Sequence, residues 1–299
     1  MILVTGAGGF VGSRVVDRLV SEGFAVRALV RNTATTLARF PAGVAIVAGD
    51  VTRPETLGPA FDGIDMLVHS AFITADRKQG PGVNYQATNV AGSRNVIEAA
   101  RGAGVRHSVV VSGLGTKPSR PGSYMHGRYL GEQAVRESGI TWSMVGASIQ
   151  FGSGSAFIEG LTDLIRSAPV VPMVGSGRLR FQPIWVEDVV TCVVTMLKQP
   201  GQYAGRKIDI GGPEYLTYAE ILDLLMETMH VHRLKIPAPV PAVVLGAHMM
   251  ELLLAKPPIT VAATDLFAFD NITTLDAVQR EFGFSPRSLR DYLRERGVS

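Results

Sequence analysis

Short apolar runs alternate with amphipathic stretches along the first half of the chain. Several runs are apolar at consecutive positions, with many β-branched residues. Such strands are covered on both faces, as in a parallel sheet built from βαβ units. The pattern predicts strands at 2–5, 25–30, 45–48, 66–70, 108–112 and 142–145, with helices near 11–21, 55–61, 84–103 and 124–137.

The pattern changes after Gln150, where Gly-, Ser- and Pro-rich stretches interrupt the alternation. A strand-like run at 181–186, a helix at 187–198 and a strand at 207–210 indicate a return to the sheet. We therefore expect an α/β fold with a doubly wound parallel sheet of the Rossmann type, formed by residues 1–150 and 181–212. Residues 151–180 and 213–299 would form a smaller C-terminal substrate lobe, in which the apolar stretch 240–255 is interpreted as a core or dimer helix.

Composition narrows the class of protein. With 46% hydrophobic and 18% charged residues among 299, the chain is too apolar to be disordered. The net charge of +3 gives no indication of nucleic-acid binding. The single Cys192 excludes an intramolecular disulfide and a cysteine-only metal site, favours a reducing cytoplasmic location and is expected to be buried.

Two sequence features bear on membranes. The N-terminus lacks the charged region of a secretory signal. The most apolar stretch, 240–255, contains Pro241, His248 and Glu251 and is too short to span a bilayer. We therefore predict no transmembrane segment. The oligomeric state is a separate question, for which a homodimer and a complex with another protein are both open alternatives.

A glycine-rich turn joins the first strand to the first helix. The spacing is G-x-x-G-x-x-G, where the first glycine permits a tight turn, the second allows the backbone to approach phosphates, and the third lets the helix pack on the strand. A helix N-terminus at this position attracts a pyrophosphate. We expect the dinucleotide to contact Gly6, Gly8, Gly9, Phe10, Val11 and Gly12.

The end of the second strand bears on the choice between NADP(H) and NAD(H). An NAD site usually offers a carboxylate about 20 residues after the glycines, whereas an NADP site offers Arg. No carboxylate lies between Glu22 and Asp50, and Arg31 ends the strand. This favours NADP(H), with NAD(H) still open; the alternative interpretation of Arg31 is a solvated side chain.

Residues after the third and fourth strands complete the expected cofactor site. Asp50, followed by Val51, could accept a hydrogen bond from the adenine amino group, or could simply form an N-cap-like turn. The small Ser70 and Ala71 leave room beside the cofactor. His69 is interpreted as a packed or cofactor-lining residue rather than an acid or base.

Together these residues resemble the short-chain dehydrogenase/reductase superfamily in its extended or atypical branch, similar to proteins like the nucleotide-binding subunit of complex I and to NmrA-like proteins. The likeness covers nearly the whole chain. Besides the glycine turn, its main motifs are Val68-His69-Ser70-Ala71, Asn89-Val90-Ala91-Gly92-Ser93-Arg94-Asn95, Arg128-Tyr129-Leu130-Gly131-Glu132 and Gly211-Gly212-Pro213-Glu214.

The resemblance implies a proton-donating Tyr, a Lys four residues later and a Ser that ends the fifth strand. Tyr124, Arg128 and Ser112 occupy these positions, so a guanidinium replaces the family's Lys. Residues four apart share one face of a helix, which brings the cation beside the phenol. The alternative role of Tyr124 is that of a core or pocket-lining residue. Gly113 replaces the family's second Ser.

Three further positions are weaker candidates. Arg180 lies in a segment that resembles the place where extended members contact a nucleotide-sugar pyrophosphate, and the alternative is a solvated basic turn. Asp188 is expected to cap or orient its helix. His230 and His232 have no third ligand nearby, so we predict no metal.

Three hypotheses about function follow. The leading one is an NADP(H)-dependent oxidoreductase acting on a small carbonyl, quinone-like or enone substrate, in which Tyr124 supplies the proton. The second is a catalytically silent nucleotide-binding protein that serves as a sensor, an assembly factor or a structural subunit. The third, based on Arg180, is a nucleotide-sugar epimerase or dehydratase.

Overall fold

The fold is described from a computed structural model, which covers residues 1–34, 39–76, 78–80, 83–254, 257 and 259–298. The chain divides into two compact units. The first comprises Met1–Ile73, Gln79–Gly146 and Val189–Ile208, and the second comprises Thr74–Lys78, Ala147–Asp188 and Asp209–Ser299. That the second unit is a substrate lobe stays a prediction.

A seven-stranded parallel sheet flanked by helices forms the first unit, which confirms the predicted fold class. The strand order is β11-β6-β5-β4-β1-β2-β3. β1 pairs in parallel with β2 on one side and β4 on the other, so the order reverses beside β1. The strands are β1 (Ile2–Thr5), β2 (Val26–Val30), β3 (Ala45–Ala48), β4 (Met66–His69), β5 (His107–Gly113), β6 (Thr141–Ala147) and β11 (Arg206–Ile210).

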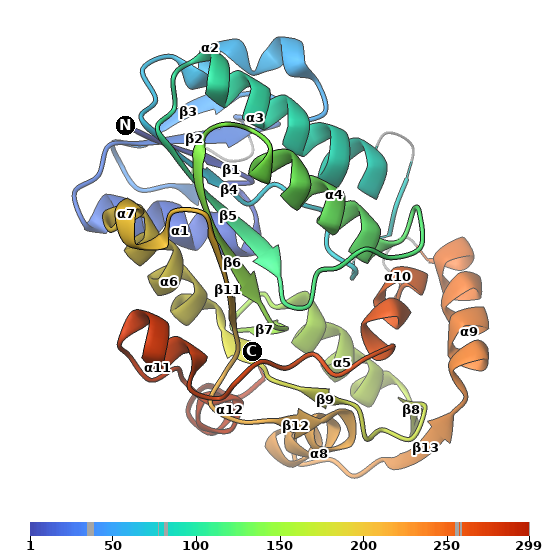
Figure 1. Ribbon diagram of the computed structural model, residues 1–299. Helices are drawn as coiled ribbons and strands as arrows, with labels where there is room; N and C mark the ends of the chain where they lie inside the picture. The colour runs from blue at the N-terminus through green and yellow to red at the C-terminus, as the bar shows by residue number, and fades with distance from the viewer. Residues whose placement is uncertain (35–38, 77, 81–82, 255–256, 258, 299) are drawn as a thin grey trace. The chain divides into compact units, whose positions relative to one another are not determined.

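Helices cover both faces of this sheet, with α3 and α4 on one face and α1 and α6 on the other (Figure 1). They are α1 (Phe10–Ser21), α2 (Gly58–Phe61), α3 (Ser93–Gly102), α4 (Tyr124–Arg136), α6 (Val186–Lys198) and α7 (Pro200–Tyr203). Before α3, the segment Tyr85–Gly92 is wound as a π-helix, so the helix expected over 84–103 is two joined helices. Cys192 on α6 is fully buried, as predicted.

The second unit consists of helices and three two-stranded sheets around its own apolar core. The pairs are β10 with β7, β12 with β9, and β13 with β8. Its strands are β7 (Gln150–Phe151), β8 (Val170–Val174), β9 (Arg180–Phe181), β10 (Ile184–Trp185), β12 (Leu216–Thr217) and β13 (Leu234–Ala238). Its helices are α5 (Ala156–Ser167), α8 (Tyr218–Thr228), α9 (Val240–Leu253), α10 (Val261–Thr264), α11 (Ala277–Phe282) and α12 (Leu289–Arg296).

One sequence prediction about this unit is wrong, and one of two alternatives for another segment is excluded. The run 181–186 does not rejoin the main sheet: β9 and β10 pair elsewhere, because Pro183 between them has no backbone N–H to continue a strand. The helix α9 is not a core helix, since Ala247 is its one residue described as buried, and its alternative role as a dimer helix stays a prediction. Leu245 and Leu252 are 65% and 79% exposed.

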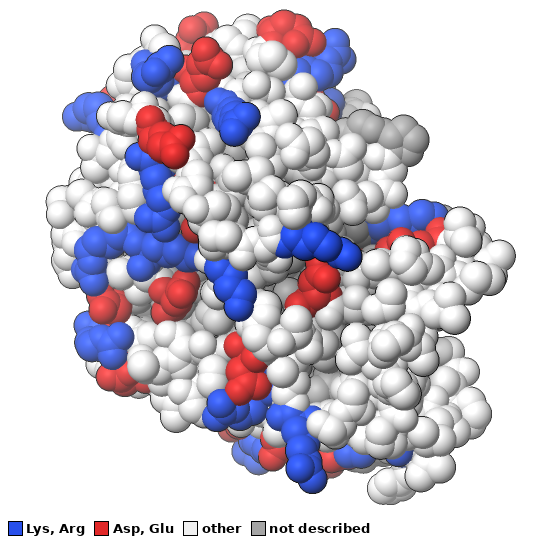
Figure 2. Space-filling model, turned by 45° about the vertical axis from the view of Figure 1, so that its right-hand side comes forward, with Lys and Arg blue, Asp and Glu red and all other residues white. Residues whose placement is uncertain are grey.

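The surface has no large region of one charge on the face shown in Figure 2, where Lys and Arg alternate with Asp and Glu. This distribution is what the small net charge of +3 leads one to expect. Among the residues described, no helix combines the length and apolar character needed to cross a bilayer.

Candidate cofactor and active site

The turn between β1 and α1 requires glycine at two positions and is tight at a third. Gly6 has φ +67°, and a Cβ there would lie 2.7 Å from the backbone of Ser70. A Cβ on Gly12 would lie 2.2 Å from the Gly6 carbonyl oxygen, and one on Gly9 would lie 3.0 Å from the same atom. The distances at Gly6 and Gly12 are shorter than a carbon–oxygen contact allows, and a side chain on Gly9 would need the Gly6 carbonyl to shift slightly. The backbone therefore forms a close-fitting cradle without side chains.

This cradle carries the groups that bind a pyrophosphate. Gly9 is the N-cap of α1, so the N–H groups at the start of the helix have no partner within it. The first turn contains no acidic residue that would repel an anion. The Gly9 N–H itself closes the turn on the Gly6 carbonyl at 2.8 Å. The positive end of the helix thus faces the carboxyl end of β1, which suits a dinucleotide.

Two arginines follow β2, whose residue Leu29 pairs with Thr5 at the end of β1. Arg31 follows β2 and is exposed. Nη1 of Arg39 lies 3.5 Å from the Gly8 carbonyl oxygen. Arg39 was not among the predicted site residues, although it is basic and lies eight positions after Arg31. A guanidinium therefore lies beside Gly8.

Asp50 forms the local turn that was the alternative to an adenine contact. Its Oδ1 accepts hydrogen bonds from the backbone N–H and the hydroxyl of Thr52, at 2.9 and 2.8 Å. Val51 is buried and its carbonyl accepts a bond from Asn95. Contact of either residue with a cofactor stays a prediction.

The end of β4 is tied to the end of β1 by short side chains. Ser70 donates through Oγ to the Thr5 carbonyl at 2.8 Å, next to the glycine cradle, and Ala71 follows it. His69 is fully buried, with Nδ1 2.8 Å from Thr5 Oγ1 and Nε2 3.0 Å from Ser93 Oγ. Burial, with a smaller contribution from Arg128, lowers the pKa of His69 to about 3, so the imidazole is neutral. It holds β1, β4 and α3 together.

Tyr124 and Arg128 come together beside Gly113, as their spacing on α4 predicts. A Cβ placed on Gly113 would lie 3.8 Å from the Tyr124 hydroxyl oxygen and 3.9 Å from Nη2 of Arg128. The guanidinium stacks on Phe72, 4.2 Å from the ring centre, and lies 5.9 Å from the ring centre of Tyr124. Arg128 is 5% exposed, and in the part of the chain that is described no carboxylate forms an ion pair with it. A buried positive charge therefore lies beside the phenol.

Ser112, the third predicted catalytic residue, donates its hydroxyl proton to Oε1 of the buried Glu132. Lys207 of β11 donates to the same oxygen at 2.8 Å and to the Gly113 carbonyl at 3.3 Å. Arg136 lies 3.5 Å from Oε2 of Glu132. This network was not predictable from the sequence, because Lys207 and Glu132 are 75 residues apart and no motif joins them.

Two predicted residues lie in the second unit and are held by internal partners. Arg180 binds both oxygens of Asp270, at 2.6 Å through Nη2 and 3.0 Å through its backbone N–H, which lowers the pKa of Asp270. Its contact with a nucleotide sugar stays a prediction. Asp188, in the first turn of α6, accepts the Arg287 backbone N–H at 2.8 Å, and burial raises the pKa of this carboxyl to about 6.

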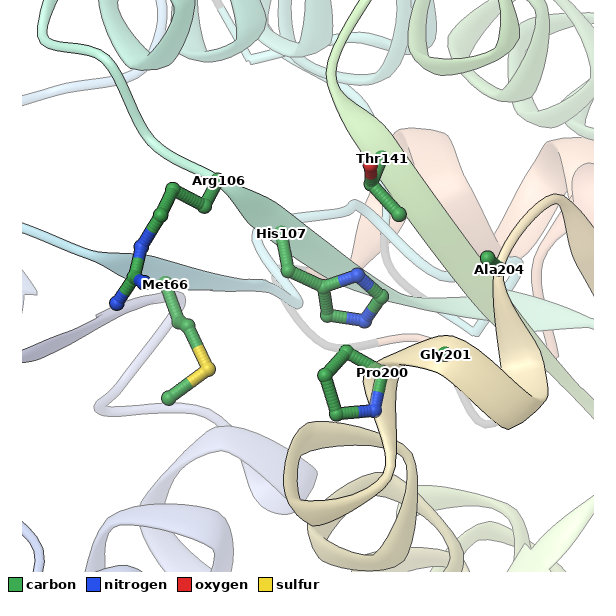
Figure 3. Close-up of a pocket in the computed structure, with 7 residues that line it drawn as sticks. All are labelled: Met66, Arg106, His107, Thr141, Pro200, Gly201 and Ala204. Atoms are coloured by element: carbon green, nitrogen blue, oxygen red, sulfur yellow. The ribbon is translucent and has the colours of Figure 1, made fainter.

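A hollow of about 440 Å³ lies at the amino ends of β4, β5 and β6, where Met66, His107 and Thr141 begin these strands (Figure 3). Cofactors in such sheets bind at the carboxyl ends of the strands. His107 is bonded to Ser143 and burial lowers its pKa. This hollow is therefore separate from the candidate cofactor site.

The fold and the glycine cradle define a dinucleotide-binding protein, and comparison with known proteins is consistent with this class. Residues 6–149 match an NAD(P)H-binding family. An NAD(P)H azoreductase from Xenophilus azovorans is 30% identical over 225 residues, which cover 74% of this chain and 71% of that enzyme. The mitochondrial NADH dehydrogenase [ubiquinone] 1 alpha subcomplex subunit 9 of Arabidopsis thaliana is 23% identical over 172 residues, 58% of this chain and 43% of that protein.

Among solved structures, the triphenylmethane reductase of Citrobacter sp. complexed with NADP(H) superposes with a TM-score of 0.76 at 22% identity, covering 99% of both chains. The chain belongs to the NAD(P)H-binding family within the atypical short-chain dehydrogenases/reductases, which confirms the resemblance. This is a family of NAD(P)-binding oxidoreductases with reductases among its members.

Proposed function

We propose that the protein is an NADP(H)-dependent oxidoreductase that transfers a hydride between the nicotinamide and a small carbonyl, quinone-like or enone substrate. The observation that carries the proposal is the meeting of the Tyr124 hydroxyl and the Arg128 guanidinium beside Gly113. They belong to the same unit as the glycine cradle. The proposed acid on α4 and the cradle after β1 are thus parts of one compact unit.

The chemistry divides between cofactor and protein. A reduced nicotinamide, when bound, supplies the hydride. Tyr124 donates a proton to the substrate oxygen and regains one from water. The positive charge of Arg128, 5.9 Å from the ring centre of Tyr124, favours the negative charge that this transfer leaves on the phenol. Gly6, Gly9 and Gly12 admit the pyrophosphate to the backbone.

The preference for NADP(H) is supported by Arg31 and Arg39. Both guanidiniums belong to the chain segment after β2, and Arg39 reaches Gly8 in the cradle. A 2′-phosphate would give them a dianionic partner, whereas a plain ribose would not. Hydrogen bonds to charged groups contribute about 1.5–3 kcal/mol, so removal of one arginine should weaken binding about tenfold to a hundredfold.

Fluorescence titration with NADPH and NADH tests this preference. We expect NADPH to bind more tightly, and Arg31→Ser to weaken NADPH binding while leaving NADH binding within a factor of two. Arg53→Ser, which removes an exposed arginine paired with Glu55, is the control and should change neither affinity. Equal or tighter binding of NADH by the unaltered protein contradicts the proposed preference.

Turnover by Tyr124→Phe tests the proton donor. We expect a loss of at least a hundredfold in kcat with the affinity for NADPH retained, since a positioned general acid contributes about 10²–10⁴-fold. Tyr129→Phe is a matched control on the same helix, because the Tyr129 hydroxyl accepts a bond from Gln133 instead of facing Gly113. Full turnover by Tyr124→Phe removes Tyr124 from the mechanism.

A second candidate function is a catalytically silent nucleotide-binding protein. It is favoured by the occupied hydroxyl of Ser112 and by the guanidinium in place of the family's Lys. Tight NADPH binding without oxidation of NADPH by any quinone, enone or ketone would support this candidate over the enzyme.

A further inference from the structure

Neither Ser112 nor Gly113 offers an uncommitted hydroxyl to a substrate oxygen. Ser112 donates its proton to Glu132, whose carboxylate is buried and also held by Lys207. Hydrogen bonds to a carboxylate are about twice as strong as those to a neutral acceptor. A ketone oxygen therefore competes poorly for the Ser112 proton.

Gly113 adds no donor, although a side chain would fit there. The nearest atoms to a Cβ at this position are Thr116 Oγ1 at 3.6 Å, Tyr124 OH at 3.8 Å and Arg128 Nη2 at 3.9 Å, all ordinary contact distances. Gly113 is also absent from the residues with positive φ. The backbone thus does not require glycine, and the missing hydroxyl is a chemical feature of the site.

Arg128 acts mainly through its charge. Its Nη2 donates to the Val111 carbonyl at 3.2 Å, and its Nε is buried without a hydrogen-bond partner. Stacking on Phe72 holds the guanidinium in place. The field of such a charge favours any nearby negative charge, including one spread over several atoms, and does not depend on one short bond.

The lack of a free hydroxyl and the buried charge of Arg128 should favour some substrates over others, according to where negative charge develops on the substrate during hydride addition. Hydride addition to an isolated ketone places the whole negative charge on one oxygen, which needs several aligned donors. Addition to a conjugated acceptor moves the π electrons through several atoms before a proton from Tyr124 completes the reduction. We propose, building on the oxidoreductase function above, that this site reduces conjugated acceptors such as quinones and enones in preference to isolated ketones.

Paired substrates test the proposal with the whole protein and NADPH. 2-Cyclohexenone and cyclohexanone differ only in conjugation, and menadione provides a quinone. We expect kcat/KM for the enone and for menadione to exceed that for cyclohexanone at least tenfold. Comparable values for cyclohexanone and the enone overturn the proposal. Failure to oxidise NADPH with every substrate instead overturns the oxidoreductase function and, with it, this inference.

Variants at Gly113 distinguish the effect of an added hydroxyl group from the effect of added side-chain volume. Gly113→Ser supplies a donor near the Tyr124 hydroxyl and should raise kcat/KM for cyclohexanone at least threefold relative to that for menadione. Gly113→Ala, which adds only a methyl group, should leave this ratio within twofold. An unchanged ratio in Gly113→Ser contradicts the proposal.

A stability measurement, which does not depend on turnover, tests whether the Ser112 hydroxyl is hydrogen-bonded to Glu132. The melting temperatures of Ser112→Ala, Glu132→Gln and the double variant form a cycle. We expect the double variant to lose less than the sum of the two single losses, since each removes the same bond. Strictly additive losses would show that Ser112 is uncommitted and would overturn the argument.

Discussion

Replacement of Lys207 by Met should destabilise the first unit strongly. The side chains of Lys207 and Glu132 are 13% and 4% exposed, so the change leaves a buried carboxylate without its cation. Removal of one partner of a buried ion pair costs about 3–5 kcal/mol. Because Arg136 remains 3.5 Å from Glu132, we expect a loss at the lower end, about 3 kcal/mol.

Urea unfolding followed by Trp142 fluorescence measures this loss. The chain has two tryptophans, so a Trp185→Phe background leaves Trp142, which lies 4.8 Å from the Arg136 guanidinium in the first unit. At about 2–4 °C per kcal/mol, the melting temperature should fall by about 6–12 °C.

Lys198→Met is the matched control. Lys198 pairs with Glu22, and their side chains are 47% and 25% exposed. Partly exposed pairs contribute about 0–1 kcal/mol, so this variant should lose little stability. Adding Glu132→Gln to Lys207→Met should restore part of the loss by removing the uncompensated charge. A loss in Lys207→Met no larger than in Lys198→Met would refute the reasoning.

Three further predictions concern the cradle and two titrating groups. Gly12→Ala places a methyl group 2.2 Å from the Gly6 carbonyl oxygen and should weaken NADPH binding at least a hundredfold in a fluorescence titration; unchanged affinity would mean that the turn adapts. Burial raises the pKa of Asp188 to about 6, so its native form retains a proton over a range in which the unfolded chain, with an ordinary value of 3.8, has lost it. Stability should therefore fall as the pH rises from 4 to 6, and Asp188→Asn should be more stable than the unaltered protein at pH 8 by up to about 3 kcal/mol; equal urea midpoints at pH 8 count against this. Burial lowers the pKa of His69 to about 3, so its contribution to stability is present above 6.5 and is lost as the pH falls towards 3, and an NMR titration should find its ring neutral at pH 5.

The main sheet was predictable because each of its strands is indicated by a run of neighbouring apolar residues. The predicted strands 2–5 and 45–48 coincide with β1 and β3, and the glycine spacing identified the turn after β1. Both features depend on residues that are neighbours in the chain. The π-helix at Tyr85–Gly92 was not predicted, since its apolar positions are also compatible with an ordinary helix.

The donors and acceptors around the proposed acid were only partly predictable. The four-residue spacing of Tyr124 and Arg128 on one helix placed them together correctly. The partner of Ser112 was not predictable, because Glu132 lies on another element and Lys207 comes from a strand 75 residues further on. The sequence could not decide between a core helix and a dimer helix for α9 for a similar reason, since an apolar sequence predicts burial without naming what would cover it.

The open position at Gly113 has a consequence for how this scaffold can diverge. Its backbone conformation suits any L-residue, and the space around it accepts a small side chain. Mutation at this single codon can therefore add or withdraw a polar group beside the proposed acid without rebuilding the sheet. Under the substrate preference proposed above, such a change would alter which carbonyl compounds react, while the contacts of the surrounding strands stay the same.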